Sequence, residues 1–175
     1  MRRDQLEHAI RAAGTILHAS DVIVMGSQAI LARWDHTQLP PEATDSNEVD
    51  IMAIVDDPDE VTRLADVLDG AVGELSLFHH THGFYIDGID HSTVTAPAQW
   101  RQRLIPVTSA HTTGWCLDPY DLCAAKLVAS RDKDRDFVLA LITAGLIETR
   151  LLRTRAQALP APHDHRVLDW VTAIA

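Results

Sequence analysis

Two short stretches near the N-terminus contain residues that could hold an anionic group and a metal ion. Residues 25–31 read MGSQAIL, with a Gly-Ser pair after an apolar run, and residues 46–51 read SNEVDI. Successive side chains of a strand point to opposite faces, so Glu48 and Asp50 share one face of an expected strand. Two carboxylates on one face can bind a divalent cation. A polar strand end that simply faces water has the same pattern.

The Gly26-Ser27 pair adds a second element of chemistry. A Gly-Ser turn that leads into a helix offers unpaired backbone N–H groups and a hydroxyl, and such groups bind phosphate. An ordinary capped helix has the same residues. A phosphate-binding turn beside a two-carboxylate metal site is the arrangement needed to hold a nucleoside triphosphate, with Mg²⁺ (or Mn²⁺) neutralising its charge.

The composition limits the classes of protein that fit. A chain of 175 residues with 46% hydrophobic residues is typical of a globular domain with a real core. The net charge of −10 argues against a protein that coats nucleic acid nonspecifically. The two cysteines do not form a disulfide framework, and no apolar run reaches bilayer length. The N-terminal segment lacks the apolar core of a signal peptide, so we expect a cytoplasmic protein without a membrane segment.

The hydrophobic periodicity changes along the chain, and the change divides it in two. Up to residue 117 helices and strands alternate, which predicts an α/β core over 1–117. From Asp118-Pro119 onward the pattern is helical, which predicts a helical segment over 118–175 packed on that core. The expected elements are helices over 4–18, 27–34 and 56–70, strands over 21–25, 48–55 and 112–117, strand and turn over 77–90, a short helix and strand within 94–107, and helices over 119–130, 133–146, 147–157 and 164–174.

Several longer stretches resemble a known family. The most specific is GWCLDPYDLCAAKLVASRDKD, accompanied by MGSQAIL, SNEVDI, GELSLFHHTHGFYIDGI and AQWRQRLIPV. Together they resemble the DUF6036 family of predicted nucleotidyltransferases, within the superfamily built on the polymerase-β fold. A more distant likeness is to AbiEii-type toxin nucleotidyltransferases. The resemblance implies an α+β fold, in which a minimal mixed sheet is flanked by helices and followed by a C-terminal helical segment.

The resemblance also implies roles for individual residues. Gly26 and Ser27 would hold the triphosphate, and Glu48 and Asp50 would hold Mg²⁺. Lys126 would be a catalytic, phosphate-binding cation, although a lysine on a helix edge has the same pattern. The nucleotide-binding residues implied further along are Arg131, Lys133 and Asp134. Asp134 either orients Lys126 or Lys133, or occupies a favourable helix N-terminus.

Enzymes of this superfamily use a third carboxylate as general base for the attacking hydroxyl. The candidates are Asp87 and Asp90 in FYIDGIDHST, which have opposite strand parity. We take Asp90 as the catalytic candidate and keep Asp87 as the alternative. If neither reaches the metal site, a catalytically weak module that binds nucleotide or a protein partner is the alternative function.

A histidine cluster, His79, His80 and His82, does not favour a zinc site, because on a strand only two of the three share a face. His79 and Thr81 match a pattern of the family and are expected to line the cleft. The substrate implied is a nucleoside triphosphate. The partners left open are an RNA (tRNA) acceptor, an antitoxin protein and a second copy of the chain in a homodimer.

Overall fold

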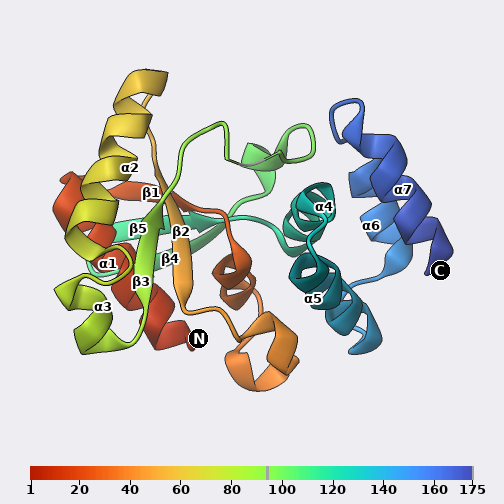
Figure 1. The fold of residues 1–175 in the computed structure, drawn as a ribbon, viewed down its shortest axis with the longest axis horizontal. Helices are drawn as coiled ribbons and strands as arrows, with labels where there is room; N and C mark the ends of the chain where they lie inside the picture. The colour runs from red at the N-terminus through yellow and green to blue at the C-terminus, as the bar shows by residue number, and fades with distance from the viewer. Residues whose placement is uncertain (94, 175) are drawn as a thin grey trace.

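Five short strands form a mixed sheet at the centre of the computed structural model, which describes residues 1–93 and 95–174 (Figure 1). The strands are β1 (Asp21–Val24), β2 (Glu48–Ala53), β3 (Tyr85–Gly88), β4 (Ile105–Ser109) and β5 (Thr112–Cys116). Their order is β3-β2-β1-β5-β4. Strand β1 is antiparallel to β2 and parallel to β5, whereas β2 and β3 are parallel and β4 and β5 antiparallel. The expected α+β fold is confirmed.

Helices precede, separate and follow the strands. The α-helices are α1 (Arg3–Leu17), α2 (Pro58–Val72), α3 (Leu77–His82), α4 (Pro119–Ala129), α5 (Asp132–Thr143), α6 (Thr149–Ala156) and α7 (His163–Ala173). Short 3-10 helices are η1 (Ser27–Ala32), η2 (His36–Gln38), η3 (Pro41–Ala43) and η4 (Trp100–Arg103). The last strand ends at Cys116, and only helices follow in the described part of the chain.

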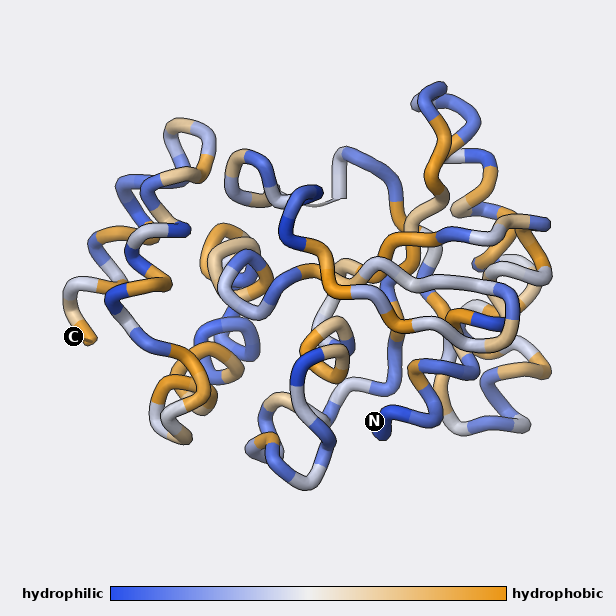
Figure 2. The backbone as a smooth tube through the Cα atoms, turned by 180° about the vertical axis from the view of Figure 1, so that it is seen from behind, coloured by the Kyte–Doolittle hydropathy of each residue, from blue (hydrophilic) through white to orange (hydrophobic). Residues whose placement is uncertain are grey.

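The sheet is covered on both faces. Val22, Ile23 and Val24 of the central strand β1 are all buried, although neighbouring side chains point to opposite faces. Helices α1 and α2 contact the strands and each other, while η1 contacts β2, β4 and β5. Figure 2 shows that hydrophobic residues predominate in the central strands and hydrophilic residues in the connections between them. Burial of this apolar surface is the main force that holds the elements together.

The C-terminal helices attach to the rest of the molecule through both α4 and α5. Helix α4 contacts η1, α5, α6 and α7, and α5 contacts η3. The buried carboxylate of Asp121 on α4 accepts hydrogen bonds from Arg103 at 2.7 and 3.0 Å. Arg155 Nε of α6 lies 3.1 Å from Asp121 Oδ1. One buried carboxylate therefore ties together η4, α4 and α6.

The local signals that end and begin helices agree with several expected boundaries. Asp118 accepts a hydrogen bond from the Tyr120 N–H at 3.0 Å, which caps α4, and Pro119 occupies its first position. Asp57 caps α2 in the same way, through the Asp59 N–H at 3.0 Å. These short-range caps are visible in the sequence because they need only the next two residues.

Two expectations about local structure were wrong. Residues 77–82 form helix α3 and not a strand. The Ser76 hydroxyl accepts from the His79 N–H at 3.1 Å to start this helix, and Gly83, with φ of 74°, ends it. The expected helix over 27–34 is a six-residue 3-10 helix, η1. In the described residues, no helix is both long and apolar enough to cross a membrane.

Candidate active site

A cavity of about 870 Å³ lies between the β2–β3 side of the sheet and helices α4 and α5. Most of the residues that the sequence singled out line this cavity. They are Gly26, Ser27, Glu48, Asp50, Asp87, Lys126, Arg131, Lys133 and Asp134. The tertiary structure thus brings together residues that are more than 100 positions apart in the chain.

Gly26 is required by close packing at the floor of the cavity. Strand β1 ends at Val24, and the Met25 N–H donates to the Asp50 carbonyl oxygen at 3.1 Å, which holds the turn against β2. A Cβ atom on Gly26 would overlap the carboxylate of Asp50. A glycine therefore lets the turn and the carboxylate approach each other. The first N–H groups of η1 follow directly, and the first N–H groups of a helix have no partner within it.

Three carboxylates lie on one face of strands β2 and β3. Asp87 is the register partner of Asp50, and Tyr85 is the register partner of Glu48. In neighbouring parallel strands, register partners place their side chains on the same face of the sheet. Asp87 therefore joins Glu48 and Asp50 on the face that lines the cavity.

The charges of these carboxylates repel one another. Burial, followed by the charges of Glu48 and Asp87, raises the pKa of Asp50 to about 6, against the opposing effect of Lys126. Burial, followed by the charges of Asp69, Glu48 and Glu74, raises the pKa of Asp87. The site thus carries more negative charge than its own cations neutralise.

A divalent cation fits this donor set in charge and in ligand type. Carboxylate oxygens are the ligands that Mg²⁺ and Mn²⁺ prefer, and Mg²⁺ is usually bound through one or two carboxylates together with substrate phosphates. In the described residues, no three His, Cys, Asp or Glu side chains are gathered closely enough to hold a metal ion on their own. The arrangement suits a metal that binds together with a phosphate-bearing ligand.

Asp90, the residue preferred from the sequence as third carboxylate, does not line this cavity. Its Oδ1 accepts from the Ser92 N–H at 2.8 Å and from the Ser92 hydroxyl at 2.6 Å. These hydrogen bonds lower the pKa of Asp90. Strand β3 ends at Gly88, so Asp90 lies in the turn that follows it. Of the two candidates, the structure places Asp87 beside Asp50.

An ion-pair network centred on the buried Asp134 forms the opposite wall of the cavity. Lys126 Nζ lies 3.0 Å from Asp134 Oδ1, and Arg131 Nε lies 2.6 Å from Asp134 Oδ2. Lys126 Nζ also lies 4.6 Å from the centre of the Phe137 ring. Burial alone would raise the pKa of Asp134, but the Arg131 hydrogen bond and the Lys126 charge outweigh it and lower that pKa. Asp134 therefore orients Lys126 and Arg131.

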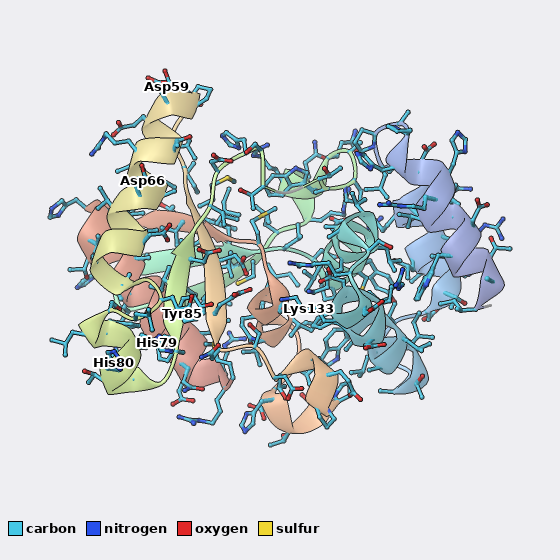
Figure 3. The ribbon with its side chains drawn as sticks, viewed as in Figure 1. Asp59, Asp66, His79, His80, Tyr85 and Lys133 are labelled. Atoms are coloured by element: carbon cyan, nitrogen blue, oxygen red, sulfur yellow. The ribbon has the colours of Figure 1, made fainter. Side chains whose placement is uncertain are left out.

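Lys133 is placed differently from the two cations that contact Asp134. It lines the cavity and makes no ion pair within the described residues. Figure 3 shows it on the side of α5 nearer the sheet. Because Asp134 does not hold Lys133, this side chain can contact an anionic ligand directly.

His79 and Thr81, which we expected to line the cleft, lie elsewhere. His79 and Thr81 are on helix α3, and neither lines the cavity. The His82 ring packs 4.4 Å from the ring of His8 on α1.

Tyr85 contacts the candidate site although the sequence did not single it out. Its hydroxyl donates to Glu48 Oε2 at 2.9 Å. The strand parity that Tyr85 shares with Asp87 was a signal that could have found it.

Together, the Gly-Ser turn after β1, the acid-x-acid strand β2 and the acidic neighbour β3 define a minimal nucleotidyltransferase fold. The comparisons with known proteins agree with this class. The family described as nucleotidyltransferase of unknown function (DUF6036) matches residues 4–172, and the chain belongs to this family. No curated protein and no solved structure matched the chain.

Proposed function

We propose that this protein is a metal-dependent nucleotidyltransferase that transfers a nucleoside monophosphate from a nucleoside triphosphate to a hydroxyl group and releases pyrophosphate. One observation carries the proposal. Asp87 is in register with Asp50, on the face that Glu48 also shares, in the cavity that contains Gly26, Ser27 and Lys126. Phosphoryl-type transfer needs positioning and charge stabilisation more than covalent chemistry, and this arrangement offers both.

The chain's own residues would divide the work as follows. The Gly26-Ser27 turn would bind the triphosphate through N–H groups and the Ser27 hydroxyl. Lys126, Arg131 and Lys133 would balance the negative charge of the phosphates from the opposite wall. Asp134 would hold two of these cations in place. Glu48 and Asp50 would hold Mg²⁺ (or Mn²⁺), which supplies charge neutralisation and orientation of the triphosphate when bound.

Asp87 would act as general base. The acceptor oxygen attacks the α-phosphorus, the bond from that phosphorus to the bridging oxygen breaks, and pyrophosphate leaves with the electron pair. The proton of the acceptor hydroxyl passes to the Asp87 carboxylate. The raised pKa of Asp87 suits this role, because a stronger base accepts a proton more readily.

The charges at the cavity support a compact acceptor group. Three acidic residues that line the cavity make no ion pair within the described residues: Glu42, Asp45 and Asp136. Among the basic residues of the cavity, Lys133 likewise makes no ion pair there, so negative charge predominates. A long nucleic-acid backbone would be repelled by such a surface. An RNA end, a protein hydroxyl or a small molecule fits better. The likeness to AbiEii-type toxins suggests a more specific version of this function, in which the acceptor is a tRNA and the partner is an antitoxin protein.

The decisive experiment is label transfer. The protein is incubated with each of the four α-³²P-labelled nucleoside triphosphates, Mg²⁺ or Mn²⁺, and total RNA, protein or small-molecule extract. We expect label in one acceptor fraction with wild type, and none with Glu48→Gln or Asp50→Asn. Asp90→Asn is the matched control, since it removes a neighbouring carboxylate outside the cavity.

A second candidate is a nucleotide-binding module without transferase activity. It is favoured by the lack of a ready-made three-ligand metal group in the described residues. Calorimetry separates the two functions. Binding of Mg²⁺ with nucleoside triphosphate, without transfer to any acceptor fraction, would support the binding module and contradict the transferase. Equal binding by wild type and Asp50→Asn would contradict the metal site.

A further inference from the structure

The hydroxyl of Tyr85 contacts one of the two carboxylates assigned above to the metal. It donates a hydrogen bond of 2.9 Å to Glu48 Oε2. Hydrogen bonds to an ionised carboxylate are among the stronger ones in proteins, so this contact restricts how the Glu48 side chain can rotate. It uses one acceptor site of Oε2, and the carboxylate keeps further lone pairs with which to bind a cation.

The backbone holds this pair in place. Glu48 and Tyr85 are register partners in the parallel ladder of β2 and β3, and Asp50 and Asp87 are the equivalent pair two residues further on. The Tyr85 N–H donates to the Asn47 carbonyl oxygen at 3.0 Å, which starts that ladder. Among the described residues that line the cavity, Glu48, Asp50 and Asp87 are present and Tyr85 is not. Tyr85 therefore reaches Glu48 from beside the cavity.

The Tyr85 ring is itself supported by His79. The two ring centres are 4.9 Å apart, and Figure 3 shows the two side chains next to each other between α3 and β3. His79 Nδ1 accepts from the Leu75 N–H at 3.1 Å, and its Nε2 lies 3.4 Å from Asn47 Nδ2. The hydrogen bond from Leu75 restricts rotation of the His79 ring, against which Tyr85 packs.

We propose that Tyr85, supported by His79, is a positioning residue that presents Glu48 to the metal ion. This inference rests on the proposed function, since it concerns a ligand of the metal assigned there. Partners that hydrogen-bond to metal ligands orient them, and their loss typically costs about 10- to 100-fold in metal affinity or activity. Tyr85 does not line the cavity, so its contribution passes through Glu48.

The test measures metal binding directly. The free Mn²⁺ remaining in solution is followed by electron paramagnetic resonance, with Mn²⁺ alone and with a non-hydrolysable nucleoside triphosphate analogue. We expect Tyr85→Phe to weaken Mn²⁺ binding about tenfold while keeping the ring and the fold. Tyr120→Phe is the matched control, because Tyr120 is the chain's other tyrosine and its hydroxyl accepts from the Glu148 N–H, away from the cavity.

A second measurement separates positioning from general damage. If Tyr85 acts through Glu48, saturating Mn²⁺ restores the kcat of Tyr85→Phe toward the wild-type value. His79→Ala is expected to weaken Mn²⁺ binding by a smaller factor. The double variant is expected to bind no more weakly than Tyr85→Phe alone, because His79 acts through the tyrosine.

The outcomes are distinguishable. Equal Mn²⁺ affinity in wild type and Tyr85→Phe, together with loss of Mn²⁺ binding in Glu48→Gln, overturns this inference and leaves the proposed function standing. A wild type that binds no Mn²⁺, with or without the nucleotide analogue, overturns both. Full additivity of Tyr85→Phe and His79→Ala overturns the role of His79.

Discussion

Asp87 of β3 lies opposite Asp50 of β2 in the register of two parallel strands, so their carboxylates share the face that lines the cavity. Asp90, three residues later, is bound by Ser92 in the turn after β3. Of the two candidates for a third carboxylate, Asp87 is therefore the one that lines the same cavity as Glu48 and Asp50.

The first prediction compares these two aspartates in the label-transfer assay. Asp87→Asn should lower kcat by a factor of about 10² to 10⁴, because a general base contributes that much to a transfer reaction. Asp90→Asn should stay within about twofold of wild type. A loss of kcat in Asp90→Asn with an active Asp87→Asn would reverse the assignment.

The second prediction concerns the close approach of Gly26 to Asp50. Gly26→Ala should abolish binding of Mg²⁺ with nucleoside triphosphate, since its Cβ would displace the Asp50 carboxylate. Gly70 on α2 has open space around the position of a Cβ, so Gly70→Ala is the control. That control should raise the free energy of unfolding by about 0.5–1 kcal/mol, the helix preference of alanine over glycine, and leave binding unchanged. Calorimetry and urea unfolding measure both effects.

The third prediction concerns the buried Asp134. Asp134→Asn should lower the free energy of unfolding by about 3 kcal/mol at pH 7, because it leaves Lys126, whose side chain is 12% exposed, without its counter-ion. The pKa of Asp134 is lowered in the folded state, so its contribution is fully present above the ordinary aspartate pKa of about 3.9 and is lost as the pH falls below it.

The measurement for Asp134 is urea unfolding of wild type and Asp134→Asn between pH 7 and pH 3. The difference between the two proteins should be largest at neutral pH and should shrink below about pH 4. A difference that does not change with pH would show that the ion pairs of Asp134 do not contribute to stability.

The fourth prediction concerns the repulsion between carboxylates at the proposed metal site. Asp50→Asn should raise the free energy of unfolding by about 1 kcal/mol in the absence of divalent metal, because it removes one of the carboxylates that repel each other next to the sheet. Mg²⁺ or Mn²⁺ should raise the melting temperature of wild type and not that of Asp50→Asn. If the metal raises both melting temperatures equally, it binds elsewhere.

Local sequence was sufficient for much of the fold and of the site. The alternation of Glu48 and Asp50 follows from the period of a strand, and the caps at Asp57 and Asp118 need only their next neighbours. The same local reasoning failed at 77–82. There the Ser76 cap and the positive φ of Gly83 favour a short helix, where we expected strand and turn.

The sequence by itself singled out the candidate residues: the Gly26-Ser27 turn, the Glu48 and Asp50 pair, and Lys126 with the block that follows it. Tertiary structure decided which of them meet. Strand parity alone did not choose between Asp87 and Asp90, because the choice depends on how β3 pairs with β2 and on where β3 ends. That pairing, like the contact between Tyr85 and Glu48, joins residues 37 positions apart, and only the packed sheet brings them together.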